Sequence, residues 1–128
     1  MEKLLLGKNF KINNINILTL AFLGDAVFDL IVREHIILNN DYNLKDINRA
    51  KVQMVCCKSQ ASLVDKIICN FYDDELNIYK RGRNSKVKNI PDGASREEYH
   101  KATGLEAVVG YLYLRGKIDR ITELLKID

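Results

Sequence analysis

The chain has 128 residues, the size of one domain, and is long enough to bury a core without disulfides or a structural metal. Apolar residues make up 47% of it and charged residues 29%, which is ordinary for a globular soluble protein, and no apolar run approaches the roughly 20 residues of a membrane helix. The formal net charge of +3 is too small to establish a polyanionic partner, so the placement of the charges matters more than their sum. We expect a single domain over residues 1–128.

The N-terminus and the cysteines indicate a cytoplasmic protein. The segment MEKLLLGKNFK has only three consecutive leucines, too few for the apolar region of a signal peptide. The three cysteines, Cys56, Cys57 and Cys69, are odd in number and form no CxxC pair, so neither a disulfide framework nor a zinc site is indicated. We expect them to be buried, reduced thiols.

Helical spacing dominates the chain and predicts an all-α fold. The first helix is expected over residues 17–38. Apolar residues recur in it at spacings near three, four and seven, namely Leu23, Val27, Leu30, Ile31 and Leu38. Asp25, Asp29 and Arg33 follow one another four residues apart, so they share a different stripe of the same helix.

The later segments also predict helices. These are expected over residues 44–56, about 59–68, 73–82, 96–116 and 117–127. Glycine, asparagine, serine and proline in GRNSKVKNIPDGAS predict a loop over residues 82–95. Ser95 and Glu98 have the S-x-x-E spacing of a capping box, which starts the helix that follows.

Two carboxylates stand inside apolar helical stretches, each accompanied by glycine. Asp25 follows Gly24 in FLGDAVFDL, and Glu106 lies between two glycines in TGLEAVVGYLYL. Glycine within a helix costs about 1 kcal/mol relative to alanine, so it indicates close helix packing or close approach of a ligand. If the two helices cross at their glycines, the carboxylates meet, and a divalent cation such as Mg²⁺ would offset their repulsion. Two unrelated surface carboxylates, or an ion pair with Arg33, are the alternatives.

A basic segment, YKRGRNSKVK, lies between these two motifs. It carries five positive charges with no acid among them: Lys80, Arg81, Arg83, Lys86 and Lys88. Gly82 would add backbone flexibility and Asn84 a hydrogen-bonding side chain, as contact with a phosphate backbone requires. Lys51, together with Arg49 and Lys58, would extend the basic patch if the fold brings them near. A solvated basic loop is the alternative.

Phe22 precedes Asp25 by three residues in the first predicted helix. Packing in the core is one interpretation of this aromatic residue. An exposed position at a dimer interface is the other.

The two acidic motifs resemble those of the ribonuclease III family. LAFLGDAVFDL, residues 20–30, resembles the family signature, and ATGLEAVVGYLYL, residues 102–114, resembles its second acidic motif. With the basic segment between them, the resemblance narrows to the mini-ribonuclease III group, which consists of a catalytic domain without the usual double-stranded RNA-binding domain. The resemblance covers about residues 15–125.

The resemblance implies a homodimeric, magnesium-dependent endoribonuclease with a ribonuclease III-like helical bundle. Such enzymes cleave double-stranded RNA to leave 5′-phosphate and 3′-hydroxyl ends. The role of the group is maturation of large-subunit ribosomal RNA precursors, with a ribosomal protein as a candidate partner that presents the substrate.

Individual residues match the family motifs. Asp25 matches the signature aspartate and Glu106 the later glutamate, so both are expected catalytic residues and Mg²⁺ ligands. Phe22 matches the position that inserts into the partner subunit, which favours the interface over the core. The expected RNA contacts are Arg81, Arg83, Asn84, Lys86, Lys88 and Lys51.

Two positions depart from full-length ribonuclease III. Ala21 and Thr103 stand where that family usually has a glutamate and an aspartate, so two of the usual carboxylates are absent. The mini group resembles this sequence in lacking them. The number of metal ions therefore stays open. Asp29 matches a position that is commonly acidic in the mini group, where it either supports the site or pairs with Arg33.

Two non-enzymatic interpretations compete with the nuclease. One is a catalytically silent RNA-binding or ribosome-associated domain of the same fold, which would not need the acids Asp25 and Glu106. The other is a helical protein-interaction domain, for which the basic segment would be incidental.

Overall fold

The computed structural model describes residues 5, 15–39, 44–85 and 95–125, and all regular structure within these ranges is helical. The elements are α1 (Ile17–Asn39), α2 (Leu44–Val55), α3 (Cys57–Ile67), the 3₁₀ turn η1 (Ile68–Asn70), α4 (Asp73–Arg83), α5 (Arg96–Leu114) and α6 (Ile118–Leu125). The predicted all-α class is confirmed. None of the helices described here has the length and apolar character needed to span a membrane.

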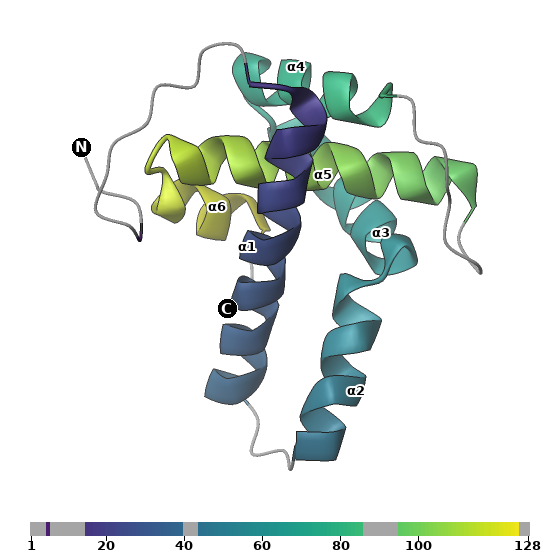
Figure 1. Ribbon diagram of the computed structural model, residues 1–128, viewed down its shortest axis with the longest axis vertical. Coiled ribbons are helices and arrows are strands. Elements are labelled where there is room, and N and C mark those ends of the chain that lie inside the picture. The colour runs from purple at the N-terminus through teal and green to yellow at the C-terminus, as the bar shows by residue number, and fades with distance from the viewer. Residues whose placement is uncertain (1–4, 6–14, 40–43, 86–94, 126–128) are drawn as a thin grey trace.

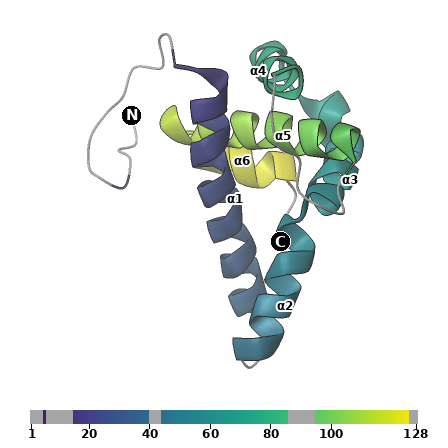
Figure 2. The ribbon, with the colours of Figure 1, turned by 45° about the vertical axis from the view of Figure 1, so that its right-hand side comes forward.

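Helix α5 is the centre of the molecule. In Figure 1 it runs across the view, α1 crosses it steeply, and α1 and α2 project together away from it. The same arrangement is visible after rotation in Figure 2, where α4 covers the opposite side of α5 from the end of α1 and α2. Residues 102–105 and 107–110 are buried in unbroken runs, which means that neighbours cover every side of α5.

The start of α5 is fixed by the predicted capping box. The Ser95 hydroxyl accepts a hydrogen bond from the Glu98 N–H at 3.0 Å, and the Glu98 carboxylate accepts one from the Ser95 N–H at 3.1 Å. These two bonds satisfy N–H groups that have no partner within a helix.

The buried face of α1 differs from the predicted one. Leu30 and Leu38, expected among the core positions, are 50% and 82% exposed. The buried stripe is instead Leu20, Ala21, Gly24, Phe28, Val32 and Ile36. Because α1 is apolar on several sides, spacing alone does not select a face, and the close approach at Gly24 decides which stripe turns inward.

The cysteines also differ from expectation. Cys56 and Cys69 are exposed and Cys57 is half-buried, so the predicted buried thiols are wrong, although all three are free as expected. Cys56 lies between α2 and α3 and Cys69 lies in η1, and residues at such junctions have fewer neighbours than those in the middle of a packed helix.

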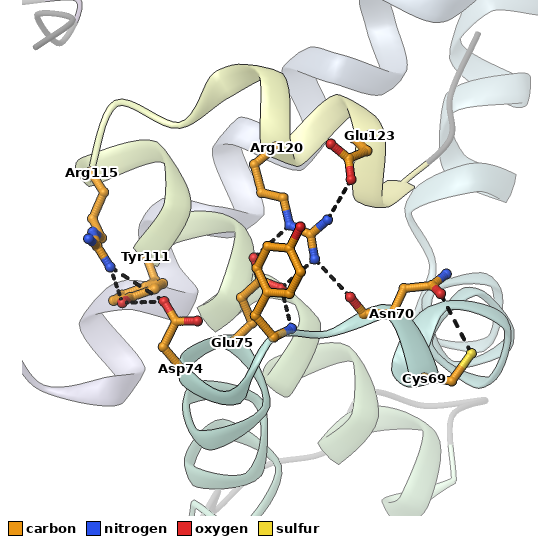
Figure 3. A network of polar contacts seen from close by, with 9 residues as sticks. Cys69, Asn70, Asp74, Glu75, Tyr111, Arg115, Arg120 and Glu123 are labelled. Carbon is orange, nitrogen blue, oxygen red and sulfur yellow. Dashed lines mark hydrogen bonds and ion pairs between the residues drawn. The ribbon is translucent and has the colours of Figure 1, made fainter.

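A buried ion pair fixes the start of α4 to α6 (Figure 3). The Arg120 guanidinium donates to both Glu75 carboxylate oxygens, at 2.8 and 2.7 Å, and to the Asn70 carbonyl at 2.8 Å. It also lies 3.9 Å from the centre of the Tyr72 ring. Glu75 is 1% exposed and is further held by the Tyr72 N–H, at 2.8 Å. The pair therefore satisfies a carboxylate that would otherwise be buried without a counter-ion.

Replacing Arg120 by Ala is expected to lower the free energy of unfolding by about 3–5 kcal/mol, because it leaves the Glu75 carboxylate buried and unpaired. Arg115→Ala is the matched control, since the Arg115–Asp74 pair spans 3.4 Å and both side chains are about 40% exposed. It should cost about 1 kcal/mol or less. Urea denaturation of both variants measures the difference, and equal losses would contradict a special role for the buried pair.

Candidate active site

Helices α1 and α5 cross with their backbones in contact, at the predicted glycines. A Cβ atom added to Gly24 would overlap the Glu106 carbonyl oxygen and lie 2.8 Å from the Gly110 nitrogen. A Cβ atom added to Gly110 would overlap the carbonyl oxygen of Leu20 in the same way. No other residue has a side chain small enough for this crossing, so the two glycines set how closely the helices approach.

This crossing brings Asp25 and Glu106 together. Asp25 is exposed on α1, immediately after Gly24, and Glu106 is half-buried on α5. Burial, then a hydrogen bond with Asp25 and the negative charge of Asp25, together raise the pKa of the Glu106 carboxyl to about 9. The expected meeting of the two carboxylates is therefore present in the structure, and the alternative of two unrelated surface acids is excluded.

Arg33 pairs with Asp29 rather than with Asp25. The Arg33 Nε atom lies 2.9 Å from one Asp29 carboxylate oxygen, and the Lys51 Nζ atom lies 3.3 Å from the other. Asp29 thus pairs with Arg33 within α1 and ties α1 to α2 through Lys51. Lys51, which the sequence offered as an RNA contact, has this carboxylate as its neighbour.

The two positions with missing acids are occupied by buried residues. Ala21 is 7% exposed and Thr103 is 6% exposed. The Thr103 hydroxyl donates to the Tyr99 carbonyl at 3.0 Å, a hydrogen bond within α5.

Across the described ranges, no three His, Cys, Asp or Glu side chains gather where they could hold a metal ion. The two carboxylates nevertheless fit Mg²⁺, which binds proteins through one or two carboxylates and completes its shell with water and phosphate oxygens.

Helix α3 adds residues that the sequence did not single out. Gln60 hydrogen-bonds with the Glu106 carboxylate and acts on its pKa in the opposite direction to Asp25. Burial raises the pKa of the Cys57 thiol, with the charge of Glu106 as the next cause. Tyr99, on α5, also has a raised pKa, through burial first and then the negative groups of the site. The one available signal was an amide at position 60 in an otherwise apolar stripe.

The basic segment begins within α4, and because the helix continues through Arg83, the loop predicted from residue 82 starts two residues later. Gly82 is not a flexible hinge: it is buried, and a Cβ atom there would lie 2.9 Å from the Gly104 Cα atom. The Arg83 guanidinium lies 5.6 Å from the centre of the Tyr79 ring. The cationic end of α4 is thus packed against α5 within two residues of Glu106.

Three of the expected RNA contacts stand at this end of α4, whereas Lys51 lies on α2. Arg81 and Asn84 are exposed and Arg83 is half-buried, with its Nε atom 3.3 Å from the Asn84 side-chain oxygen. Lys86 and Lys88 lie outside the described residues.

Phe22 is 81% exposed on α1, so its packing in the core of this chain is excluded. Leu18 and Leu30, on the same stripe of the helix, are 41% and 50% exposed. The three side chains form an apolar stripe close to Asp25 that nothing in the described chain covers.

A helical fold with paired acids and a cationic helix end carries the groups that a metal-dependent nuclease needs. The chain belongs to the ribonuclease III family, since the Ribonuclease III domain matches residues 18–117, and it is an endoribonuclease. Relatives bear the name Mini-ribonuclease 3. One from Clostridium tetani is 34% identical over 99% of this chain and 87% of its own length, and one from Brevibacillus brevis is 39% identical over 89% and 85%. The predicted resemblance to the mini-ribonuclease III group is thereby confirmed.

The fold is also shared with a solved protein. The crystal structure of a protein from Fusobacterium nucleatum superposes with a TM-score of 0.83 at 34% sequence identity, covering 91% of this chain and 93% of the other. The ribonuclease III-like helical fold predicted from the sequence is therefore confirmed.

Proposed function

We propose that this chain is a catalytic domain that cleaves double-stranded RNA with the help of Mg²⁺. The observation that carries the proposal is the meeting of Asp25 and Glu106 at the glycine crossing of α1 and α5. Two carboxylates in contact repel each other once both are ionised, and a divalent cation removes that repulsion. The alternative of a silent RNA-binding domain gives no reason to keep this arrangement.

Asp25 and Glu106 would hold the metal, which supplies Lewis-acid assistance to the scissile phosphate and an acidified water as nucleophile. Asp25 and Glu106 differ in their surroundings. Asp25 is open to solvent and to an approaching phosphate, whereas Glu106 is held from behind by α3. Glu106 must give up its proton when the metal binds, because only the carboxylate is a ligand.

Arg81, Arg83 and Asn84 are proposed to contact the RNA backbone, together with Lys86 and Lys88 beyond the end of α4. The resemblance to the family supports this assignment, and the exposed positions of Arg81 and Asn84 leave them open to an approaching duplex. Contacts to phosphates and 2′-hydroxyls read the shape of the duplex, so little base specificity is expected. Lys51 would join them only after leaving Asp29.

The finer parts of the proposal concern the cellular substrate. The substrate we propose is a precursor of large-subunit ribosomal RNA in the cytoplasm, with a ribosomal protein that presents it. The group resemblance supports this choice, and the cleavage products should carry 5′-phosphate and 3′-hydroxyl ends.

The decisive experiment compares one RNA sequence as a duplex and as a single strand, together with the matching DNA duplex. We expect cleavage of the RNA duplex alone, in Mg²⁺ and not in EDTA. Gel analysis of end-labelled strands measures both the rate and the end groups. Binding of the duplex without any turnover in Mg²⁺ would contradict the proposal and favour the silent domain.

We also propose that the exposed stripe of α1 forms a homodimer through Phe22. Phe22→Glu should convert a particle of twice 14.7 kDa into one of 14.7 kDa, because it places a charge in an apolar interface. Leu38→Glu is the matched control, since Leu38 is 82% exposed on the same helix but sixteen residues further on, and it should stay dimeric. Sedimentation velocity distinguishes these outcomes, and a monomeric parent protein at micromolar concentration would refute the interface.

A further inference from the structure

Gln60 is a polar side chain in the middle of a buried face. It is 2% exposed, and the other buried residues of α3 are Ala61, Val64 and Ile67. This face packs against α5, where Glu106 lies. An amide taken out of water needs hydrogen bonds to offset its lost solvation, so each of its polar atoms is expected to have a partner.

The nitrogen end of this amide bridges two helices. Its Nε2 atom donates to the carbonyl oxygen of Val55, the last residue of α2, at 2.9 Å. A carbonyl oxygen can only accept, so this bond fixes which end of the amide is nitrogen. The same side chain hydrogen-bonds with the Glu106 carboxylate. Gln60 therefore links Glu106 on α5 to the end of α2.

The oxygen end of the amide has no partner. Gln60 Oε1 is one of two side-chain atoms in the described chain that are buried and make no hydrogen bond, the other being His100 Nδ1. A buried acceptor that has lost its water and gained no donor destabilises the protein. A donor that arrives with a ligand at the neighbouring carboxylates would remove this cost.

We propose that Gln60 is a positioning residue of the carboxylate site, whose N–H group holds Glu106 toward α1 and whose Oε1 accepts a hydrogen bond from a water molecule of the bound Mg²⁺. Mg²⁺ keeps several of its water ligands, and groups that hydrogen-bond to metal ligands orient them. Because Ala21 and Thr103 supply no carboxylate, Asp25 and Glu106 would leave more of the ligand positions of Mg²⁺ to water, and Gln60 Oε1 would supply an acceptor for it. This inference rests on the proposed function and extends it to α3.

The test measures binding of Mn²⁺ alone, by electron paramagnetic resonance of the free ion, with no RNA present. Gln60→Met has a similar length and removes both hydrogen-bonding groups, and we expect it to weaken Mn²⁺ binding about tenfold. Gln60→Glu retains an oxygen acceptor and should lose less affinity than Gln60→Met. Gln53→Met, the same change at an exposed position of α2, is the matched control and should bind as the parent does.

Three results would overturn the proposal: parental Mn²⁺ affinity in folded Gln60→Met, equal losses in the Met and Glu variants, or no Mn²⁺ binding that depends on Asp25. Equal losses are what a role limited to capping α2 predicts. If Gln60→Met does not fold, Gln60→Glu decides alone, and an affinity as low as that of Asp25→Asn would refute the role. Failure of the proposed function is separate, because it would appear as absent RNA cleavage by a parent protein that still binds Mn²⁺ through Asp25.

Discussion

Replacing Asp25 by Asn should lower the rate of RNA duplex cleavage by about a thousandfold, with the fold retained. The amide keeps the size of the side chain but removes the charge that would bind the metal, and Asp25 is exposed, so packing does not change. Single-turnover cleavage in saturating Mg²⁺ measures the effect. Glu34→Gln, on the exposed side of the same helix, is the control and should cleave at the parental rate. A rate for Asp25→Asn within a few fold of the parent would remove Asp25 from the site.

Glu106→Gln should also abolish cleavage, yet it should stabilise the metal-free protein at alkaline pH. With its pKa raised to about 9, folded Glu106 keeps a proton that the unfolded chain releases near pH 4.5. Between these values the folded state binds more protons than the unfolded state, so stability falls as pH rises. Glutamine removes this dependence. In EDTA, the melting temperature of Glu106→Gln relative to that of the parent should therefore rise from pH 5 to pH 8. A constant difference in melting temperature over this range would contradict the burial of the carboxyl.

Replacing Gly24 by Ala should lower the free energy of unfolding by about 3 kcal/mol or more, through overpacking of two backbones. The added Cβ atom meets the carbonyl oxygen of Glu106, which no rotation of a side chain can move. Gly82→Ala should cost less, since its added Cβ atom would lie 2.9 Å from the Gly104 Cα atom and 3.1 Å from the Ala107 Cβ atom, without the overlap found at Gly24. Ala26→Ser, at an exposed position of α1, should change stability by about 0.5 kcal/mol or less. Urea denaturation ranks the three variants, and the reverse order would refute the crossing.

Much of the helical framework could be predicted from local signals. The capping residues Ser95 and Glu98 define the start of α5, and the acidic first turn and basic last turn of α4 bound that helix near its observed ends. These signals act within a few residues and need no knowledge of the fold. The buried face of α1 could not be predicted in the same way, since Leu30 and Phe28 are equally apolar and only the partner helix distinguishes them.

The site divides along the same line. The proximity of Asp25 and Glu106 could be predicted from the sequence, because the glycines near them indicate a close crossing of two helices. The contribution of Gln60 could not, because its contact with Glu106 arises from the packing of α3 on α5, and glutamine in a helix is ordinary. The sequence alone indicates flexibility at Gly82, whereas the close contact with Gly104 shows that Gly82 is a packing residue. In each case the missing information was the identity of the neighbour.

Helix α4 is fixed at both ends, by Arg120 at its start and by Gly104 against Gly82 at its finish. A helix fixed at both ends loses little conformational entropy when a ligand binds. Binding should therefore require little ordering of α4, and any conformational change needed for a good fit would have to occur in the nucleic acid. As the proposed RNA contact, α4 would therefore distinguish duplexes by their stiffness and curvature, and a helix interrupted by bulges would bind it differently from a regular one.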